Sequence, residues 1–264
     1  MSAENLELAV DGGAVDTHCH LFLGEVEPAV VVETARGAGV ERLICVGVDV
    51  ESSRASLELA DSLEGVFATA GVHPHDAASF DAAASSRVEE LLHDPRVVGV
   101  GECGLDYFRM RSPVEDQLST FAAHAALSRD SGKPMVVHVR DAWPDVLRIL
   151  EEQRAERVVI HCFSGDDTIA KECVERGYWI SFAGNVTYPR NDHLRAAAAA
   201  VALDRVVVET DSPFLAPQTL RGRENQPANV VHTLAEVARV RGVAIDEVVR
   251  ATSVNARAAF PGLR

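Results

Sequence analysis

Eight short runs of apolar, largely β-branched residues recur along this chain and limit what it can fold into. Segments with helical spacing and helix-forming residues separate them. Strands that alternate with helices pair in parallel through right-handed crossovers, and eight such units over about 250 residues predict an α/β fold, the (β/α)8 TIM barrel. An open doubly wound sheet is the structural alternative. The runs are 14–15, 42–48, 66–72, 96–100, 134–137, 157–160, 178–182 and 205–208, and the helical segments are 28–36, 52–63, 86–93, 114–129, 142–153 and 167–176.

The rest of the chain supports a single domain over residues 1–264. No linker and no repeat beyond the strand and helix unit divides it, and this length suits one large core. Residues 212–227 contain three prolines and Gly222, which predicts an irregular loop, and its place after the last strand favours a wall or lid over a site. Further helices are expected at 196–203, 228–241 and 245–259.

The formal net charge of −15 argues against one class of nucleic-acid-binding protein. Proteins that hold nucleic acid by a general electrostatic surface do so with clustered Lys and Arg. Any phosphate substrate of this chain must therefore be held locally, by cations or by a few arginines.

Cysteine usage and the N-terminus predict a cytoplasmic protein. The five cysteines are odd in number, widely spaced and form no Cys-x-x-Cys pair, which favours a reducing compartment. Residues 1–7 have neither a basic region nor an apolar core, and no later run approaches the roughly 18 apolar residues of a membrane span. Neither export nor membrane insertion is expected.

His18 and His20 are the first candidate site residues. In an extended strand, side chains at i and i+2 point to the same face, so these two imidazoles would project together. Such a pair alone is a weak signal. Polar groups also follow other apolar runs, and they can meet only if the sheet closes into a barrel, whose active sites gather at the carboxyl ends of the strands. The additional candidates are Glu102, His138, His161 and Asp211.

Imidazole and carboxylate together are the ligand mixture of Zn, Mn or similar divalent ions. A network of His–carboxylate hydrogen bonds is the alternative, but buried carboxylates are costly and no basic residue is obviously placed to neutralise them. We expect two divalent ions (Zn, Mn or Mg) about 4 Å apart, which together activate water and orient an ester. One ion is assigned to His18, His20, Glu102 and Asp211, and the other to Glu102, His138 and His161, so that Glu102 bridges them.

Several other signals are given a structural interpretation. The G-x-G-x-x-G match at 99–104 does not open a helix smoothly and places a carboxylate where pyrophosphate would lie, so it is rejected. Strand alternation is expected to turn Cys19 and Cys162 away from the site, and Glu209 is expected to support a ligand from behind. Five histidines are interpreted as ordinary surface or capping residues: His75, His93, His124, His193 and His232.

The polar segments of the chain, taken in their order along the sequence, resemble the successive motifs of the TatD family of metal-dependent deoxyribonucleases. The resemblance runs over essentially the whole chain and implies an amidohydrolase-like barrel, a divalent metal centre, hydrolysis of phosphodiester bonds in DNA, and ligands at the six positions named above. One departure is Gln226, where the family usually carries Glu, which puts loop anchoring or substrate preference in doubt. The matching segments are 16–20, 71–75, 101–107, His138, 161–165 and 209–213.

The predicted reaction is an attack of water on phosphorus, with Asp211 accepting the proton and Glu102 shared between the ions. His73, Arg140 and Arg221 are expected to contact the phosphate, and single-stranded DNA or strand ends are the expected substrate. Two alternatives remain: a small-molecule hydrolase of the same barrel class acting on a phosphotriester, lactone or cyclic amide, and a non-catalytic metal-binding scaffold.

Overall fold

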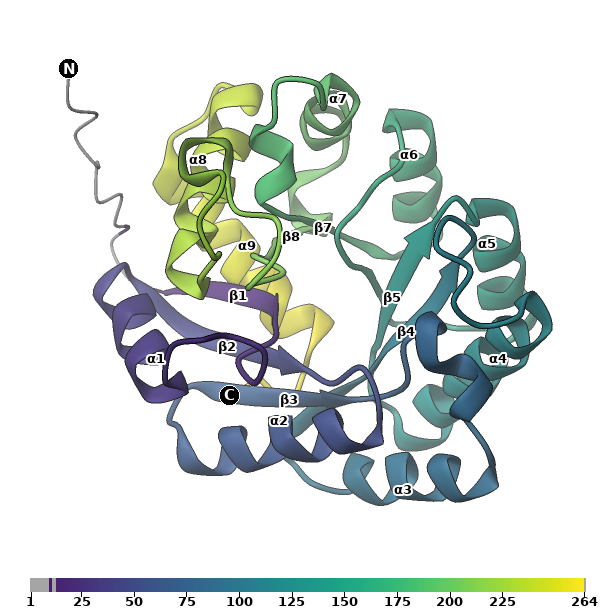
Figure 1. Ribbon diagram of the computed structural model, residues 1–264. Coiled ribbons are helices and arrows are strands. Elements are labelled where there is room, and N and C mark those ends of the chain that lie inside the picture. The colour runs from purple at the N-terminus through teal and green to yellow at the C-terminus, as the bar shows by residue number, and fades with distance from the viewer. Residues whose placement is uncertain (1–9, 11–12, 264) are drawn as a thin grey trace.

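The computed structural model describes residue 10 and residues 13–263, and it confirms the predicted barrel (Figure 1). Eight parallel strands pair in chain order, and helices surround them on the outside. The expectation about export rests on residues 1–7, which lie outside the described residues. The strands are β1 (Ala14–Cys19), β2 (Val40–Val46), β3 (Val66–Ala70), β4 (Val97–Asp106), β5 (Met135–Arg140), β6 (Val158–Ile160), β7 (Trp179–Phe182) and β8 (Val206–Val208). The α-helices are α1 (Pro28–Gly37), α2 (Val50–Ser62), α3 (Ala82–Leu92), α4 (Val114–Ser131), α5 (Trp143–Glu152), α6 (Asp167–Glu175), α7 (Asp192–Ala200), α8 (Val230–Arg241) and α9 (Ile245–Ala259).

The ring closes where β1 meets the chain that follows β8. The backbone N–H of Asp211 donates to the carbonyl of His18 at 2.9 Å, and the N–H of His20 donates to the carbonyl of Ser212 at 2.8 Å. A parallel bridge pairs Cys19 with Ser212 at the same place. Closure of the barrel therefore sets His18, His20 and Asp211 beside one another.

The amino end of the barrel is filled by apolar side chains. Each strand contributes at least one of them, in most strands from near the start, so they form a continuous layer across the barrel interior. Phe260, which directly follows α9, is fully buried against this layer. The barrel members are Val15, Ile44, Val46, Phe67, Val98, Val136, Val159, Trp179 and Val207.

Several predicted elements are longer in the structure, and in two helices the reason is a capping side chain before the predicted start. Helix α2 begins at Val50, since Asp49 caps it by accepting from the Ser52 N–H. Helix α3 begins at Ala82, where Asp81 accepts from the Ala84 N–H. Helix α7 also begins four residues before its predicted start at 196. Strand β4 runs to Asp106 instead of ending at residue 100, which places Glu102 inside a strand.

The close approach of β3 and β4 helps to position Glu102. A Cβ added at Gly71 would lie 2.5 Å from the Gly101 Cα, so a side chain at residue 71 would push the two backbones apart. Absence of a side chain at this position lets the residue before Glu102 lie against the carboxyl end of β3.

Residues 212–227 form the irregular loop that the prolines predicted, with a short 3-10 turn at Gln218–Leu220 and a second, Pro227–Asn229, that begins at its last residue. Phe214 and Leu215 from this loop line the pocket at the carboxyl end of the barrel, so the expectation of a wall is confirmed. Within the described part of the chain, no helix is both long and apolar enough to cross a membrane.

Candidate metal centre

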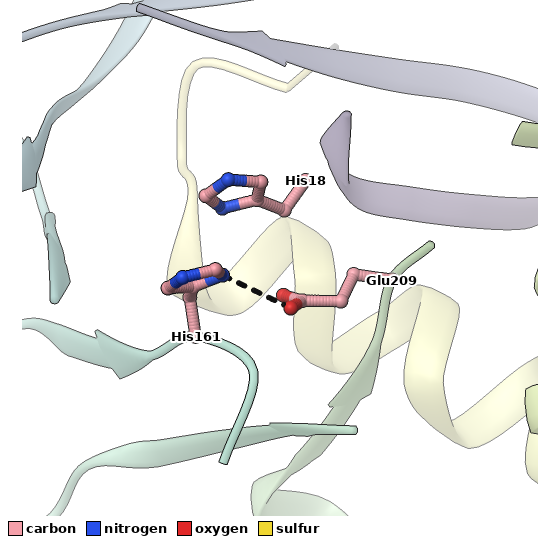
Figure 2. Close-up of side chains that lie close together, drawn as sticks. All are labelled: His18, His161 and Glu209. Carbon is pink, nitrogen blue, oxygen red and sulfur yellow. Dashed lines mark hydrogen bonds and ion pairs between the residues drawn. The ribbon is translucent and has the colours of Figure 1, made fainter. Parts of the chain in front are cut away.

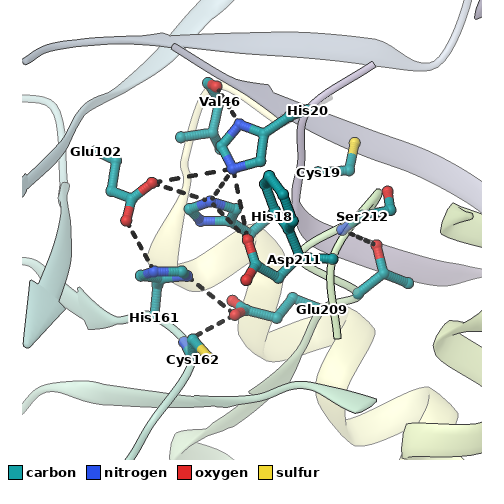
Figure 3. Close-up of polar contacts among 12 residues, drawn as sticks. His18, Cys19, His20, Val46, Glu102, His161, Cys162, Glu209, Asp211 and Ser212 are labelled. Atoms are coloured by element: carbon teal, nitrogen blue, oxygen red, sulfur yellow. Dashed lines mark hydrogen bonds and ion pairs between the residues drawn. The ribbon is translucent and has the colours of Figure 1, made fainter. Parts of the chain in front are cut away.

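Glu102 lies at the centre of buried imidazoles at the carboxyl end of the barrel (Figure 3). Its Oε2 is 3.4 Å from His18 Nε2 and 4.0 Å from His20 Nε2. Its Oε1 is 2.9 Å from both His138 Nδ1 and His161 Nε2. The two oxygens of one carboxylate therefore face two different pairs of imidazole nitrogens.

The group around Oε2 is open enough to hold a cation. His18 Nε2 and His20 Nε2 face each other at 3.2 Å, and Asp211 Oδ1 lies 3.8 and 3.5 Å from them. Direct charged hydrogen bonds are shorter, about 2.7–2.9 Å, whereas ligand atoms held at 2.0–2.1 Å from one cation lie roughly 3.0–3.4 Å apart. The His18–His20 and His18–Glu102 distances fall within the second range and the other distances in the group are wider, so these four side chains leave room for a shared cation and make no short direct hydrogen bond to one another.

The charges of the cluster point to the same conclusion. Burial alone would raise the pKa of the Glu102 carboxyl, but the charge of His161 and the hydrogen bonds of His138 and His161 outweigh it and hold that pKa well below its usual range. Burial opposes protonation of His161, yet Glu102 and Glu209 raise its pKa well above the ordinary value. Among the described residues, the ion-pair partners of Glu102 and Asp211 are all histidines. A divalent cation would supply the positive charge that protonated imidazoles otherwise supply, and its binding would release protons.

Glu209 orients His161 from behind (Figure 2). Its Oε1 accepts from His161 Nδ1 at 3.0 Å and from the Cys162 N–H at 2.7 Å, and its Oε2 accepts from Ser181 Oγ at 2.6 Å. His18, whose ring stacks on that of His161, also lies close to Glu209. Because both Glu209 oxygens are already hydrogen-bonded, its geometry agrees with the expected supporting position and turns His161 Nε2 toward Glu102.

His73 and His75 extend the cluster over β4. The N–H of His75 donates to His73 Nδ1 at 3.1 Å, so His73 carries its proton on Nε2, which lies 3.3 Å from Glu102 Oε1. Burial lowers the pKa of His73 to about 4, so this imidazole is neutral. Asp106 Oδ2 lies 2.8 Å from His75 Nε2 and 3.4 Å from His138 Nε2.

The interpretation of His75 as a surface residue was therefore wrong, and no role had been given to Asp106. Alternation along β4 could have indicated Asp106, because residues 102 and 106 share one face of an extended strand. His124 was also misjudged, since it is fully buried between α4 and the end of β3.

A pocket of about 680 Å³ opens above the cluster. Arg140 lies in its wall, with its guanidinium 5.0 Å from the centre of the Phe108 ring. Cys162 also lines the pocket, against the expectation from strand alternation, because its φ of 42° is left-handed and breaks the strand pattern. Arg221 instead stacks on Tyr188, 4.5 Å from the ring centre.

The structure thus brings together the six side chains that the sequence predicted as ligands, with His73 against Glu102 and Arg140 in the pocket wall. These positions agree with the predicted roles.

Comparisons with known proteins agree with this architecture. The family profile described as TatD related DNase matches residues 15–261. The chain is 33% identical over 249 residues to the Bacillus subtilis uncharacterized metal-dependent hydrolase YabD, covering 93% of this chain and 98% of that protein. It is 35% identical over 237 residues to a Klebsiella pneumoniae 3'-5' ssDNA/RNA exonuclease TatD, covering 87% and 90%. The crystal structure of YJJV, a TatD homologue from Escherichia coli, superposes with a TM-score of 0.91 at 26% identity, covering 96% and 99%.

Proposed function

Because the chain belongs to the TatD related DNase family, we propose that it is a metal-dependent hydrolase that cleaves phosphodiester bonds of single-stranded DNA from strand ends. The placement of Glu102 carries this proposal, since one buried carboxylate that faces two groups of imidazoles suits a bridged pair of cations. The activity printed in the name of the Klebsiella relative supports the substrate class.

The proposed ligands divide between two divalent ions, Zn, Mn or Mg. His18, His20, Glu102 and Asp211 hold one ion, and Glu102, His138 and His161 hold the other. When bound, such ions lower the pKa of water and stabilise charge on phosphoryl oxygens.

The chain's own residues then bind and orient the substrate. The Asp211 carboxylate is 14% exposed on the pocket side and is the proposed acceptor of the proton from the attacking water. Arg140 is exposed in the wall and is placed to contact a phosphate. His73, with its proton on Nε2, is the proposed neutral donor beside Glu102.

The acidic exterior agrees with this substrate choice. Attraction for an anionic strand is needed only inside the pocket, and a net charge of −15 weakens non-specific binding to duplex DNA. Binding outside the pocket should therefore be weak and sensitive to salt.

The test is degradation of end-labelled single-stranded DNA with and without a chelator, comparing the parent with His138→Ala. We expect the parent to degrade the strand only when metal is present and the variant to be inactive. His193→Ala is the matched control, because it removes an exposed imidazole on α7.

Three results would reject the proposal. Hydrolysis that survives chelation would contradict the role of the ions. Turnover of small phosphotriesters, lactones or cyclic amides far above that of oligonucleotides would favour a small-molecule hydrolase. Metal binding with no hydrolysis of any of these substrates would favour a scaffold.

We also propose that residues 1–264 form one domain and that the protein works in the cytoplasm. The five cysteines, all unpaired, support a reducing location.

A further inference from the structure

Two exposed aromatic rings stand at the mouth of the pocket. Phe108 is 63% exposed and Phe214 is 52% exposed, and both line the pocket above the metal centre. Among the large hydrophobic residues that are exposed in the described part of the chain, these two are the aromatic ones. Scattered exposed apolar residues are ordinary, but two rings placed at one opening form a surface that suits a planar partner.

The rings lie on opposite sides of the barrel. Phe108 follows β4, and Phe214 follows β8 beside β1, which is half a turn away in the strand order. The Phe108 side is basic, since Arg109, Arg111 and Arg140 all line the pocket there. The Phe214 side is apolar, with Leu215 and the 47% exposed Leu23. One wall is thus suited to phosphate and both walls offer a ring.

The loop that carries Phe108 is held in place by the metal centre. Asp106 Oδ1 accepts from the backbone N–H groups of Phe108 at 3.0 Å and Arg109 at 2.7 Å, while Asp106 Oδ2 lies 3.4 Å from His138. Buried Gln117 closes the loop by accepting from the Asp106 N–H. A loop whose backbone is fixed in this way has little entropy left to lose when a partner stacks on its ring.

The Phe214 side is fixed in the same manner. The Phe214 N–H donates to the Asp211 carbonyl at 2.9 Å, and Asn225 Nδ2 donates to the Phe214 carbonyl at 2.7 Å. The backbone of each aromatic residue is therefore fixed a few residues from a carboxylate of the site.

We propose that Phe108 and Phe214 are stacking platforms for unpaired bases, and that they select single strands by the bases next to the bond being cut. This inference rests on the proposed function and names how the same site recognises its substrate. Base faces are free in a single strand, but in a duplex they are covered by neighbouring base pairs. Arg109, Arg111 and Arg140 would contact the phosphates of the stacked nucleotides.

The experiment compares two substrates of equal length and equal phosphate number. One is a short oligothymidylate, and the other carries tetrahydrofuran abasic units in place of the thymidines. Phe108→Ala and Phe214→Ala should each lower kcat/KM on the oligothymidylate by roughly tenfold, mostly through KM, and leave the abasic strand nearly unchanged. Met110→Ala is the matched control, since it removes a 48% exposed apolar side chain from the same loop. Phe214→Tyr, which keeps a ring, should retain the parent value.

A second readout does not depend on hydrolysis. With chelator present, a strand containing 2-aminopurine should lose fluorescence on binding the parent as its base stacks, and this quenching should weaken in both alanine variants. Equal losses on the two strands, or parent values in both alanine variants, would overturn the stacking role. A parent enzyme that cleaves neither strand would instead overturn the proposed function.

Discussion

The two ends of the barrel are built from the same eight strands but have opposite chemistry. At the amino end, the inward side chains are apolar, and Phe260 seals the layer. At the carboxyl end, the interior holds His18, Glu102 and Glu209, all at most 3% exposed. Buried apolar area stabilises a fold, whereas buried charge costs stability unless it is paired or coordinated. The apolar amino end stabilises the fold. This stability allows the carboxyl end to hold a buried charged cluster that is costly for folding but useful for chemistry.

The largest expected effect is at the carboxyl end. Glu102→Gln removes the charge shared by both groups of histidines, so the rate on single-stranded DNA should fall on the order of 10³-fold or more. Bound metal, measured by elemental analysis, should fall with it. Glu51→Gln, on the exposed face of α2, is the control and should match the parent. Parent rate and metal content in the Glu102 variant would mean that this end is only a hydrogen-bonded network.

The amino end should show the reverse pattern. Phe260→Ala leaves a cavity in the apolar layer and should lower the free energy of unfolding by about 3–5 kcal/mol in urea titrations. The rate and metal content per folded molecule should not change. Val254→Ala, at a 64% exposed position on α9, should change stability by less than about 0.5 kcal/mol. A comparable loss of rate per folded molecule in the Phe260 variant would break the separation between the two ends.

A smaller effect is expected from the residue behind the ligands. Glu209→Gln keeps the size of the side chain but weakens its hydrogen bond to His161, so metal affinity should fall about 10- to 100-fold. Competition with a fluorescent chelator measures this change. Glu175→Gln, exposed at the end of α6, is the control. An unchanged affinity would show that packing alone orients His161.

The smallest effect concerns pH and His124. Burial lowers the pKa of His124 from 6.5 to about 4, while its Nε2 accepts from the Val72 N–H. As pH falls, His124 therefore becomes protonated at a higher pH in the unfolded chain than in the folded chain. The contribution of His124 to the free energy of unfolding then falls as pH drops from 6.5 toward 4. Between pH 7 and 5.5 the loss should be about 1 kcal/mol.

Urea titrations at the two pH values measure this loss. His124→Gln should show a loss smaller by that amount, whereas Phe260→Ala should keep the parent pH dependence because the apolar layer has no titratable side chain. Identical pH dependence in the parent and the His124 variant would contradict this assignment.

Most of the fold could be predicted because it depends on local periodicity. The apolar runs and helical segments gave the order of the elements, and the i, i+2 spacing of His18 and His20 placed both imidazoles on one side. The predictions failed where one residue departed from that periodicity. Left-handed Cys162 turned into the pocket, and the continuation of β4 to Asp106 brought His75 into the site.

By itself, the sequence determined which residue types end each strand, and hence that imidazoles and carboxylates had to gather once the sheet closed. Only the tertiary structure decided which oxygen of Glu102 faces which group, that His161 is the side chain behind which Glu209 lies, and that Phe108 and Phe214 flank one opening. The physical reason is the separation along the chain of the residues that determine each feature. Periodicity is set by neighbours a few residues apart, whereas the direction of a carboxylate or a ring depends on contacts between strands far apart in the chain, which form only when β1 meets the chain after β8.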